Sequence, residues 1–383
     1  MSSSPRPPHV FVSGCYDLLH AGHLSFFSEA LSYVNDPSAT LTVSFASSET
    51  LWRHKRRKPS IPDGHKHAIL SSLKMVTSVV VGTDVSTPGL DFESWFMSNK
   101  PTHLIVTSDD RYAAAKRALC AKVGAEYVVL PKTPPGVAAP AEAPPVSTSS
   151  LLSSIRAPTT VPLRVDFGGG WLDVPRYSRP GAYVVNCAVS PLVSLGDWRG
   201  YRLKSGLGGS GAHAILEGRD GVKAEVDVLG VGWQDPAVVE ETGVCVWESG
   251  ERPVLRFKSG GGWLRGLMGI WWTGEQHDTP GNSDNKRDYD AIEKAGERCM
   301  EAVRVEDVEG LAEGVMMSYR AQLAEGMKPL PEVDGALGYK YCGGGWGGYG
   351  LYIFESVERR DEKCQEEGWK VIEPYCKPVG AHM

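Results

Sequence analysis

Strand-like and helix-like segments alternate along the N-terminal third of the chain, and this alternation limits the possible folds more than any other feature. HVFVSG, ATLTVSFAS, VTSVVVGTD, PTHLIVTSD and AEYVVLP are short apolar runs, which predicts buried strands. Segments with apolar residues at helical spacing lie between them, for example HLSFFSEALSYV and DDRYAAAKRALCAKVG. The alternation predicts an α/β fold with a doubly wound parallel sheet, in which ligands bind beyond the carboxyl ends of the strands.

The turn after the first predicted strand reads SGCYDLLHAGH, residues 13–23, and leads directly into a helical segment. Free backbone amides at a helix start favour anions. His20 and His23 would lie at the mouth of such an anion site, where imidazoles can donate hydrogen bonds to phosphate oxygens. A histidine pair of this spacing also fits metal ligation or helix capping, so the pair alone leaves these alternatives open.

The longer string GCYDLLHAGH resembles the G-x-[FY]-D-x-x-H-x-G-H signature of the cytidylyltransferase-like nucleotidyltransferases, in particular the heptose-phosphate adenylyltransferases. The resemblance implies that His20 and His23 are catalytic and stabilise the phosphate that is attacked. It also implies nucleotide or phosphate contacts from the residues at the start of the string, which are Gly14, Cys15, Tyr16 and Asp17.

Three further segments follow in the order that this family shows. The basic stretch WRHKRRKPS, residues 52–60, is by itself a solvated charge run or a nuclear-import patch, but the resemblance makes Lys55 a catalytic phosphate contact. VTSDDRY keeps only Asp110 of the family pattern beside the nucleotide base. VSTSSLLSSIR matches a Ser-Thr-Ser/Thr motif at a helix start, which implies phosphate contacts from Ser147, Thr148 and Ser149.

Residues 131–146, PKTPPGVAAPAEAPPV, have the composition of a linker. The serine motif that follows them belongs to the first domain by resemblance, so we interpret the stretch as an exposed loop within that domain. The predicted domains are therefore a nucleotidyltransferase domain at residues 1–156 and a second domain at residues 157–383.

Glycine-rich turns between strand-like and helix-like segments mark the second predicted domain. SGLGGSGAHAIL runs from a glycine loop into a helix, where successive amides can form a phosphate nest. The Ser210 hydroxyl of this loop can reach the phosphates or a bound Mg²⁺. No Gly-Lys-Ser/Thr of a Walker A motif follows, and glycines also occur in tight turns without a ligand, so this loop alone leaves both interpretations open.

This loop and three other segments together resemble the three motifs of the GHMP small-molecule kinases; the other segments are PLRVDFGGGWLDVP, VGWQDPA and GYKYCGGGWGGYGLYIF. Within that superfamily, they are most similar to the L-fucokinases and the heptose 7-phosphate 1-kinases. The resemblance implies an α+β fold, with Asp235 as the base for the sugar hydroxyl and Arg164 stabilising the transferring phosphoryl group. It implies sugar contacts from Asp173, Gly344 and Gly345. It implies phosphate contacts from Gly206, Gly208, Gly209, Ser210 and Gly211.

Two features depart from the kinase pattern. The segment from Ser190 to Asp235 is short for this superfamily. Trp346 stands where the third motif has a glycine, and its ring would narrow the sugar or nucleotide site. We expect a trimmed but active kinase, with a degenerate binding domain as the alternative.

A sugar kinase fused to a nucleotidyltransferase implies two consecutive reactions. A fucose- or heptose-like sugar would become a sugar 1-phosphate and then an NDP-sugar, with ATP rather than CTP as the expected nucleotide and Mg²⁺ neutralising the phosphates. One alternative is a nucleotidyltransferase for another phosphorylated alcohol, with a non-catalytic second half. A non-enzymatic binding protein built from two decayed domains is the other.

Composition limits the partners and the compartment. A net charge of −6 argues against a general nucleic-acid binder. The sequence has no run of about 18 apolar residues, which argues against a membrane span. Its start, MSSSPRPPHVFVSG, does not read as a signal peptide. We therefore expect a cytoplasmic enzyme whose partners are a nucleotide and a small sugar or sugar phosphate; a homodimer stays open.

Overall fold

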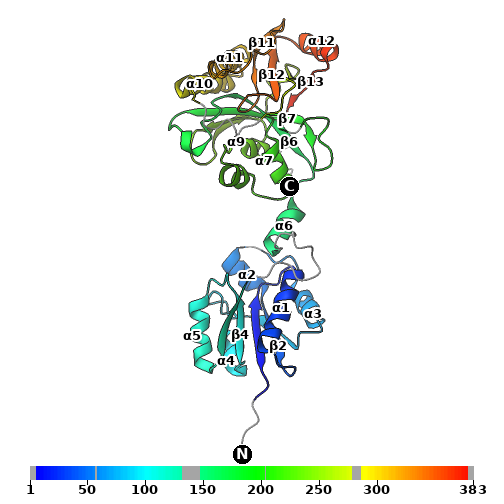
Figure 1. The fold of residues 1–383 in the computed structure, drawn as a ribbon, viewed down its shortest axis with the longest axis vertical. Helices are drawn as coiled ribbons and strands as arrows, with labels where there is room; N and C mark the ends of the chain where they lie inside the picture. The colour runs from blue at the N-terminus through cyan, green and yellow to red at the C-terminus, as the bar shows by residue number, and fades with distance from the viewer. Residues whose placement is uncertain (1–5, 57, 132–146, 203, 278–285, 378–383) are drawn as a thin grey trace, which may run out of the picture. The chain divides into compact units, whose positions relative to one another are not determined.

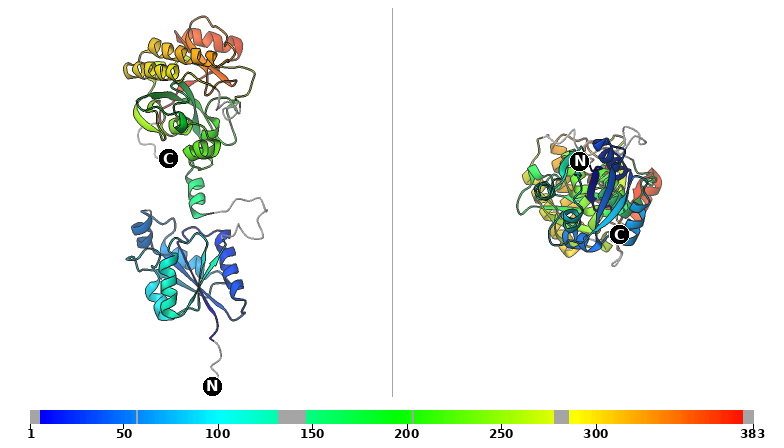
Figure 2. Two further views of the ribbon diagram at one scale, coloured as in Figure 1. Left: turned by 60° about the vertical axis from the view of Figure 1, so that its left-hand side comes forward. Right: turned by 90° about the horizontal axis from the view of Figure 1, so that it is seen from below.

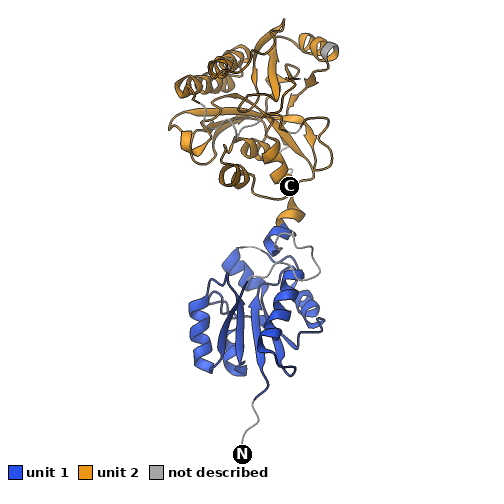
Figure 3. Cartoon of the chain, viewed as in Figure 1, with its two compact units in different colours: residues 1–152 blue, residues 153–383 orange. Residues whose placement is uncertain are grey.

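The computed structural model describes residues 6–56, 58–131, 147–202, 204–277 and 286–377. The chain divides into two compact units, unit 1 at residues 1–152 and unit 2 at residues 153–383 (Figure 3). Helix α6, Thr148–Arg156, spans this division and reaches the boundary predicted at Arg156. Apart from Pro131, the predicted loop at residues 131–146 lies outside the described residues.

Unit 1 is built on a parallel sheet (Figure 1). Its strands are β1 (His9–Gly14), β2 (Thr40–Ala46), β3 (Ser78–Gly82), β4 (His103–Thr107) and β5 (Glu126–Leu130). They lie in the order β3-β2-β1-β4-β5, and the neighbouring strands pair in parallel. The order reverses at β1, so the turn after Gly14 lies at a topological switch point, where such sheets bind ligands. The predicted doubly wound fold is confirmed.

Helices cover both faces of this sheet (Figure 2). Phe27 and Leu70 pack on one face and Phe96 and Leu119 on the other, in two separate buried clusters. In the same order, these residues belong to α1 (Ala21–Val34), α3 (Asp63–Ser71), α4 (Glu93–Asn99) and α5 (Ala113–Val123). Unit 1 also contains helix α2 (Ser48–Lys55). The sheet is therefore enclosed, and its carboxyl edge is left for ligands.

Unit 2 combines antiparallel sheets with helices, so the predicted α+β class is confirmed. One sheet contains β6 (Val161–Gly168), β7 (Tyr183–Val193), β8 (Val244–Glu248), β9 (Val254–Ser259) and β14 (Glu373–Pro374). The other, in the order β11-β12-β10-β13, contains β10 (Met268–Trp272), β11 (Ala336–Tyr341), β12 (Tyr349–Phe354) and β13 (Lys370–Val371).

The helices of unit 2 lie between and after these strands. The α-helices are α7 (Gly209–Leu216), α8 (Gly221–Lys223), α9 (Gln234–Glu241), α10 (Tyr289–Val305), α11 (Val308–Ala324) and α12 (Val357–Glu367). Short 3₁₀ turns are η1 (Pro175–Tyr177) and η3 (Gly262–Leu264), and η2 (Ala224–Leu229) is a π-helical segment. Within the described ranges, no helix of either unit is long and apolar enough to cross a bilayer.

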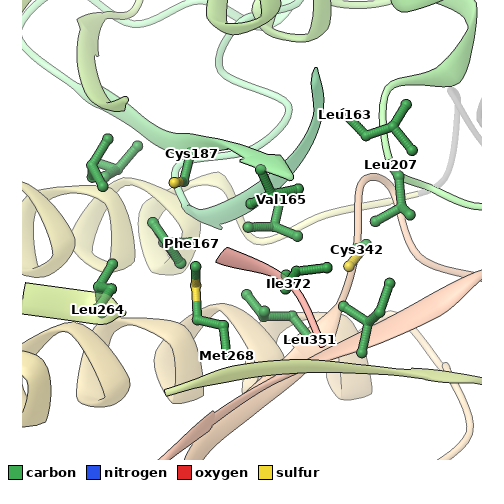
Figure 4. Close-up of a cluster of buried hydrophobic side chains, with 14 of the residues drawn as sticks. Leu163, Val165, Phe167, Cys187, Leu207, Leu264, Met268, Cys342, Leu351 and Ile372 are labelled. Carbon is green, nitrogen blue, oxygen red and sulfur yellow. The ribbon is translucent and has the colours of Figure 1, made fainter. Parts of the chain in front are cut away.

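Strand β6 is buried along its whole length and directs side chains to two environments. Leu163, Val165 and Phe167 belong to the main hydrophobic cluster of unit 2 together with Met268 and Leu351 (Figure 4). Burial of each such side chain stabilises the fold by roughly 1.5–3 kcal/mol. Since side chains alternate along a strand, the intervening polar residues of β6 point away from this cluster.

Candidate functional site

The turn between β1 and α1 places two imidazole rings face to face. The ring centroids of His20 and His23 are 3.8 Å apart with 26° between the ring planes, and Tyr16 meets His23 edge-on at 5.0 Å. Nδ1 of both histidines is buried and has no hydrogen-bond partner among the described residues. Buried polar atoms of this kind call for an explanation, and a bound ligand at the switch point supplies one.

The helix-capping and metal alternatives for this pair find little support. His20 is the N-cap residue of α1, but its side chain makes no capping hydrogen bond. The part of the chain that the structure describes contains no group of three or more His, Cys, Asp or Glu side chains arranged to hold a metal ion.

The residues before the histidines shape the turn. Tyr16 has a left-handed φ of 41°, and its ring fills the space beside Gly14, where a Cβ would lie 2.8 Å from the ring. Asp17 is fully buried and accepts hydrogen bonds from the backbone N–H and the hydroxyl of Ser60, at 2.7 and 3.1 Å. Cys15 is half-buried. Asp17 therefore ties the end of the basic stretch to the histidine turn.

Thr148 brings the serine motif to the same turn. Its hydroxyl donates to the carbonyl of Leu18 at 3.3 Å, although the two residues are 130 positions apart. The Ser147 hydroxyl accepts from the backbone N–H of Ser150 at 3.1 Å, whereas Ser149 is exposed. The structure thus joins two of the predicted phosphate-binding segments.

The other two predicted residues of unit 1 lie in different settings. Lys55 is exposed as the last residue of α2. Asp110 accepts from Tyr127 Oη at 2.7 Å and from Lys116 Nζ at 3.1 Å. Burial acts to raise the pKa of Asp110, but the hydrogen bond from Tyr127 and the charge of Lys116 outweigh it and lower this pKa.

Unit 2 contains a cavity of about 560 Å³ that is lined by residues of all three predicted kinase motifs. The predicted residues that line it are Arg164, Asp173, Gly206, Gly208, Gly209, Ser210, Asp235 and Gly344. Gly211 and Gly345 do not line it. A Cβ on Gly211 would meet Pro236 at 2.9 Å, and the Gly345 carbonyl lies 2.5 Å from Nδ1 of His277, which does line the cavity.

Arg164 connects the glycine loop with Asp235, and its partner Asp166 adds the third motif. Its Nε donates to Asp235 Oδ1 at 2.5 Å, and its Nη1 donates to the Gly206 carbonyl at 2.7 Å and to Asp166 Oδ1 at 3.1 Å. Asp166, which the sequence did not predict as a site residue, also accepts from Lys340 and, at 2.6 Å, from the Gly343 N–H. Burial acts to lower the pKa of Arg164, but the charges of Asp235 and Asp166 raise it overall.

Two further carboxyl groups face the same cavity. Asp173 accepts from the backbone N–H of Trp171 at 3.1 Å and of Gln234 at 3.2 Å. Burial and the nearby charge of Asp235 raise the pKa of Asp173 to about 7. The same two causes raise the pKa of Glu225 to about 7.

The sequence did not predict Glu225, because KAEVDVLG has the pattern of an exposed helix. Glu225 belongs to η2, and π-helical turns are frequent at functional sites. Its Oε1 is buried without a hydrogen-bond partner among the described atoms. The Ser210 hydroxyl acts against burial and the charge of Asp235 and favours the charged form of Glu225, but it does not reverse the rise of this pKa.

These oxygens fit Mg²⁺ when it arrives with a nucleotide. Mg²⁺ takes oxygen ligands and usually binds through one or two carboxylates together with substrate phosphates. Ser210, Glu225 and Asp235 line one cavity and offer a hydroxyl and two carboxyl groups. Over the described ranges no larger acidic cluster exists that could hold the ion alone, so the phosphates would complete its ligand set.

Trp346 does not narrow the cavity as expected. It is absent from the cavity lining and packs instead against the hydrophobic cluster that contains Met327, Leu330 and Tyr341. Trp346 has a left-handed φ of 58°, as have its neighbours Gly345 and Gly347, and this turn directs its ring toward the cluster. Trp346 therefore leaves the third motif open toward the cavity, which Gly343 and Gly344 line.

Comparison with known proteins adds an independent finding for unit 1. Residues 11–150 match the cytidylyltransferase-like family. The cytidylyltransferase-like domain is 34% identical over 108 residues to the FAD synthase of Thermococcus onnurineus, which covers 28% of this chain and 66% of that protein. For the FAD synthase of Thermococcus kodakarensis the match covers 53% of the relative. The chain thus spans between half and two thirds of the length of these curated relatives.

Solved kinases are similar to the C-terminal part. Mevalonate kinase of L. major is 15% identical with a TM-score of 0.42, and the match covers 58% of this chain and 96% of that one. A D-glycero-D-manno-heptose 1-phosphate kinase from Bacteroides thetaiotaomicron is 16% identical with a TM-score of 0.38 and covers 56% of this chain and 96% of that one. The roles of individual residues therefore rest on the cavity itself.

We expect His23, in the cytidylyltransferase-like domain, to titrate in the acid range. Burial, with a smaller effect of the adjacent His20 ring, lowers the pKa of His23 from 6.5 to about 4. The unfolded chain binds this proton more readily, so the folded state should lose stability as the pH falls from about 6.5 through about 4. NMR titration of wild type and His23→Gln is expected to assign a midpoint near 4 to His23; a midpoint near 6.5 would show that the ring is solvated.

Gly208→Ala is expected to lower any phosphorylation by unit 2 at least about 10-fold, because the added Cβ would press on Arg164 and Asp235 in addition to the about 1–2 kcal/mol that left-handed backbone costs alanine. Gly208 has a φ of 72°, and a Cβ would lie 2.9 Å from Arg164 Cγ and 3.2 Å from Asp235 Cγ. Gly230→Ala is the matched control, since Gly230 has a φ of 67° with no atom within 4 Å of a Cβ. A coupled kinase assay measures both variants. An equal loss of phosphorylation rate in the two would refute the role of the contact with Arg164 and Asp235.

Proposed function

We propose that the chain is a bifunctional enzyme that converts a small sugar to an NDP-sugar through its 1-phosphate. The domain at residues 157–383 transfers the γ-phosphoryl group of ATP to the sugar, and the domain at residues 1–156 joins the product to a nucleotide. The observation that carries the proposal is the cavity in which Arg164, Asp235 and the glycine loop before α7 meet.

In the first reaction, the sugar hydroxyl oxygen attacks the γ-phosphorus of ATP while the bond to the ADP oxygen breaks. Asp235 takes the hydroxyl proton, which suits a carboxylate at the cavity wall. The backbone amides at the start of α7 and the Arg164 guanidinium face the growing charge on the phosphoryl oxygens. Mg²⁺ bound near Ser210 and Glu225 would neutralise the nucleotide phosphates.

In the second reaction, an oxygen of the sugar 1-phosphate attacks the α-phosphorus of the nucleotide, and pyrophosphate leaves. His20 and His23 donate to the oxygens of the five-coordinate phosphorus, and their unused Nδ1 atoms support this role. Lys55 and the hydroxyls of the motif at Ser147, Thr148 and Ser149 bind the phosphates of the leaving group. Gly14 and the three residues after it shape the turn that holds them.

A second candidate function follows from the curated relatives. They are named FAD synthases, so the cytidylyltransferase-like domain could act on another phosphorylated alcohol, with unit 2 as a non-catalytic partner domain. Burial and the nearby charge of Asp235 raise the pKa of both Asp173 and Glu225 in the cavity of unit 2, and carboxyl groups perturbed in this way gather at functional sites, which supports the bifunctional proposal.

The deciding experiment incubates the full chain with Mg²⁺, ATP and CTP together, and a panel of free sugars, sugar 1-phosphates and FMN. Mass spectrometry of the products is expected to show a sugar phosphate with ADP, and an ADP-sugar with pyrophosphate. A CDP-sugar as the main product would overturn ATP as the nucleotide. FAD as the main product, with no sugar phosphate, would establish the second candidate.

A further inference from the structure

Trp171 forms a wall between two cavities of unit 2. It lines the cavity of about 560 Å³ and also a second cavity of about 20 Å³, which has room for a single water molecule. Its backbone is left-handed with a φ of 79°, an unusual conformation for a bulky residue. Strained backbone of this kind collects at ligand sites, where the surrounding structure holds it in place.

A buried ion pair supports the indole of Trp171. The guanidinium carbon of Arg287 lies 3.5 Å from the centre of the Trp171 ring. Arg287 Nε is 3.2 Å from Glu325 Oε2, and the two side chains are 0% and 4% exposed. Burying two charges is costly, so the pair is weak evidence for stability and calls for another role. Neither residue lines the large cavity, and the Trp171 ring lies between Arg287 and that cavity's lining.

The cavity lining near Trp171 differs from the lining near the glycine loop. Trp171 and Val174 belong to one buried cluster, whereas Leu207 and Ala212 of the glycine-loop side belong to another. The lining residues Arg202, Lys204 and His213 all lie in or beside the glycine loop. Beside Trp171, the lining includes Asp173 and Gln234, which hydrogen-bond to each other, and the apolar Val174. These lining side chains offer no cation to a phosphate, and they suit an uncharged ligand that carries hydroxyl groups.

We infer that Trp171 is the surface on which the C–H face of an uncharged acceptor sugar packs, and that Arg287 and Glu325 are positioning residues for its indole. The inference rests on the proposed kinase function of unit 2 and names the class of its acceptor. Aromatic rings in binding sites combine a large apolar face with little conformational freedom, so a fixed indole orients a sugar ring at low entropic cost.

Steady-state kinetics of five full-length proteins test this inference. They are wild type, Trp171→Phe, Trp171→Leu, the double variant Arg287→Met/Glu325→Leu, and Trp263→Leu as control. Trp263 packs against the main core and does not line the cavity. The double variant removes both charges together, which spares the fold an unpaired buried charge. The matched probes are D-mannose and D-mannose 6-phosphate, with L-fucose as a second neutral sugar.

Trp171→Leu is expected to raise the KM for the neutral sugar at least about 10-fold while the KM for ATP changes less than about twofold. Trp171→Phe should show a smaller rise. The double variant should raise the sugar KM by about 3- to 10-fold with an unchanged melting temperature, and Trp263→Leu should leave it unchanged. An unaltered sugar KM in Trp171→Leu, or preference for D-mannose 6-phosphate, would overturn the inference.

A binding measurement separates this inference from the proposed function. If wild type phosphorylates no sugar, the kinase proposal fails, and equilibrium titration of indole fluorescence with the same sugars then decides the inference. Quenching by a neutral sugar in wild type, lost in Trp171→Phe, would uphold Trp171 as the sugar surface. No such quenching, or quenching that persists in Trp171→Phe, would refute it.

Discussion

Asp235→Asn is expected to lower sugar phosphorylation by about 10²–10⁴-fold while pyrophosphate release from a supplied sugar 1-phosphate continues at the wild-type rate. Asn is nearly isosteric with Asp, so the cavity should keep its shape, but Asn does not accept the hydroxyl proton. The loss should therefore appear in kcat more than in KM. A coupled ADP assay and a pyrophosphate assay on the same preparation measure the two activities.

The structure argues against helix capping as the role of Asp235. The N-cap residue of α9 is Trp233, and the Asp235 carboxylate accepts from Arg164 instead. Asp220→Asn is a suitable control, because Asp220 caps α8 through Lys223 N–H and Asn is an equally good cap. Unchanged kinase activity in Asp235→Asn would remove this carboxylate from the mechanism.

His20→Ala is expected to lower pyrophosphate release by about 10²–10³-fold, the effect of losing one preorganised donor to the transition state. Sugar phosphorylation by unit 2 should persist, since it depends on a different set of residues. The rings of His20 and His23 stack on each other, so single and double variants together show whether the pair acts as a unit.

His65→Ala is the control for this pair, because His65 is an exposed histidine of α3 in the same unit. Wild-type rates in both His20→Ala and His23→Ala would contradict a phosphate role for the turn. A fall in His65→Ala of the same size would show that histidine loss damages unit 1 in general.

The strands of unit 1 were predictable because each is a short apolar run, and β1 to β5 lie within the predicted segments. Helix α2 was not predicted, because its charged residues mask any apolar period and Leu51 is one of only two buried residues in it. The fold class of unit 2 followed only from motif resemblance. Irregular segments of unit 2, such as the π-helical η2, have no regular spacing of apolar residues by which they could be predicted.

The candidate site was predictable where a motif is local and hidden where contacts are distant. Arg164, Asp173 and Asp235 stand in recognisable strings and meet in one cavity. Asp166 and Lys340 are 174 positions apart, so only the folded chain shows that they pair. The orientation of Trp346 likewise depended on the backbone turn around it, which residue type alone does not determine.

The distance between Asp166 and its partners has a consequence for synthesis on the ribosome. Lys340 and Gly343 emerge 174 and 177 residues after Asp166, and β14, which pairs with β7, emerges later still. Until residue 340 is made, the nascent chain can therefore offer this carboxylate its neighbour Arg164 but not Lys340, whereas the strands of unit 1 are complete by Leu130. Domains fold as units during translation, so the cavity of unit 2 should form after the histidine turn of unit 1 has folded.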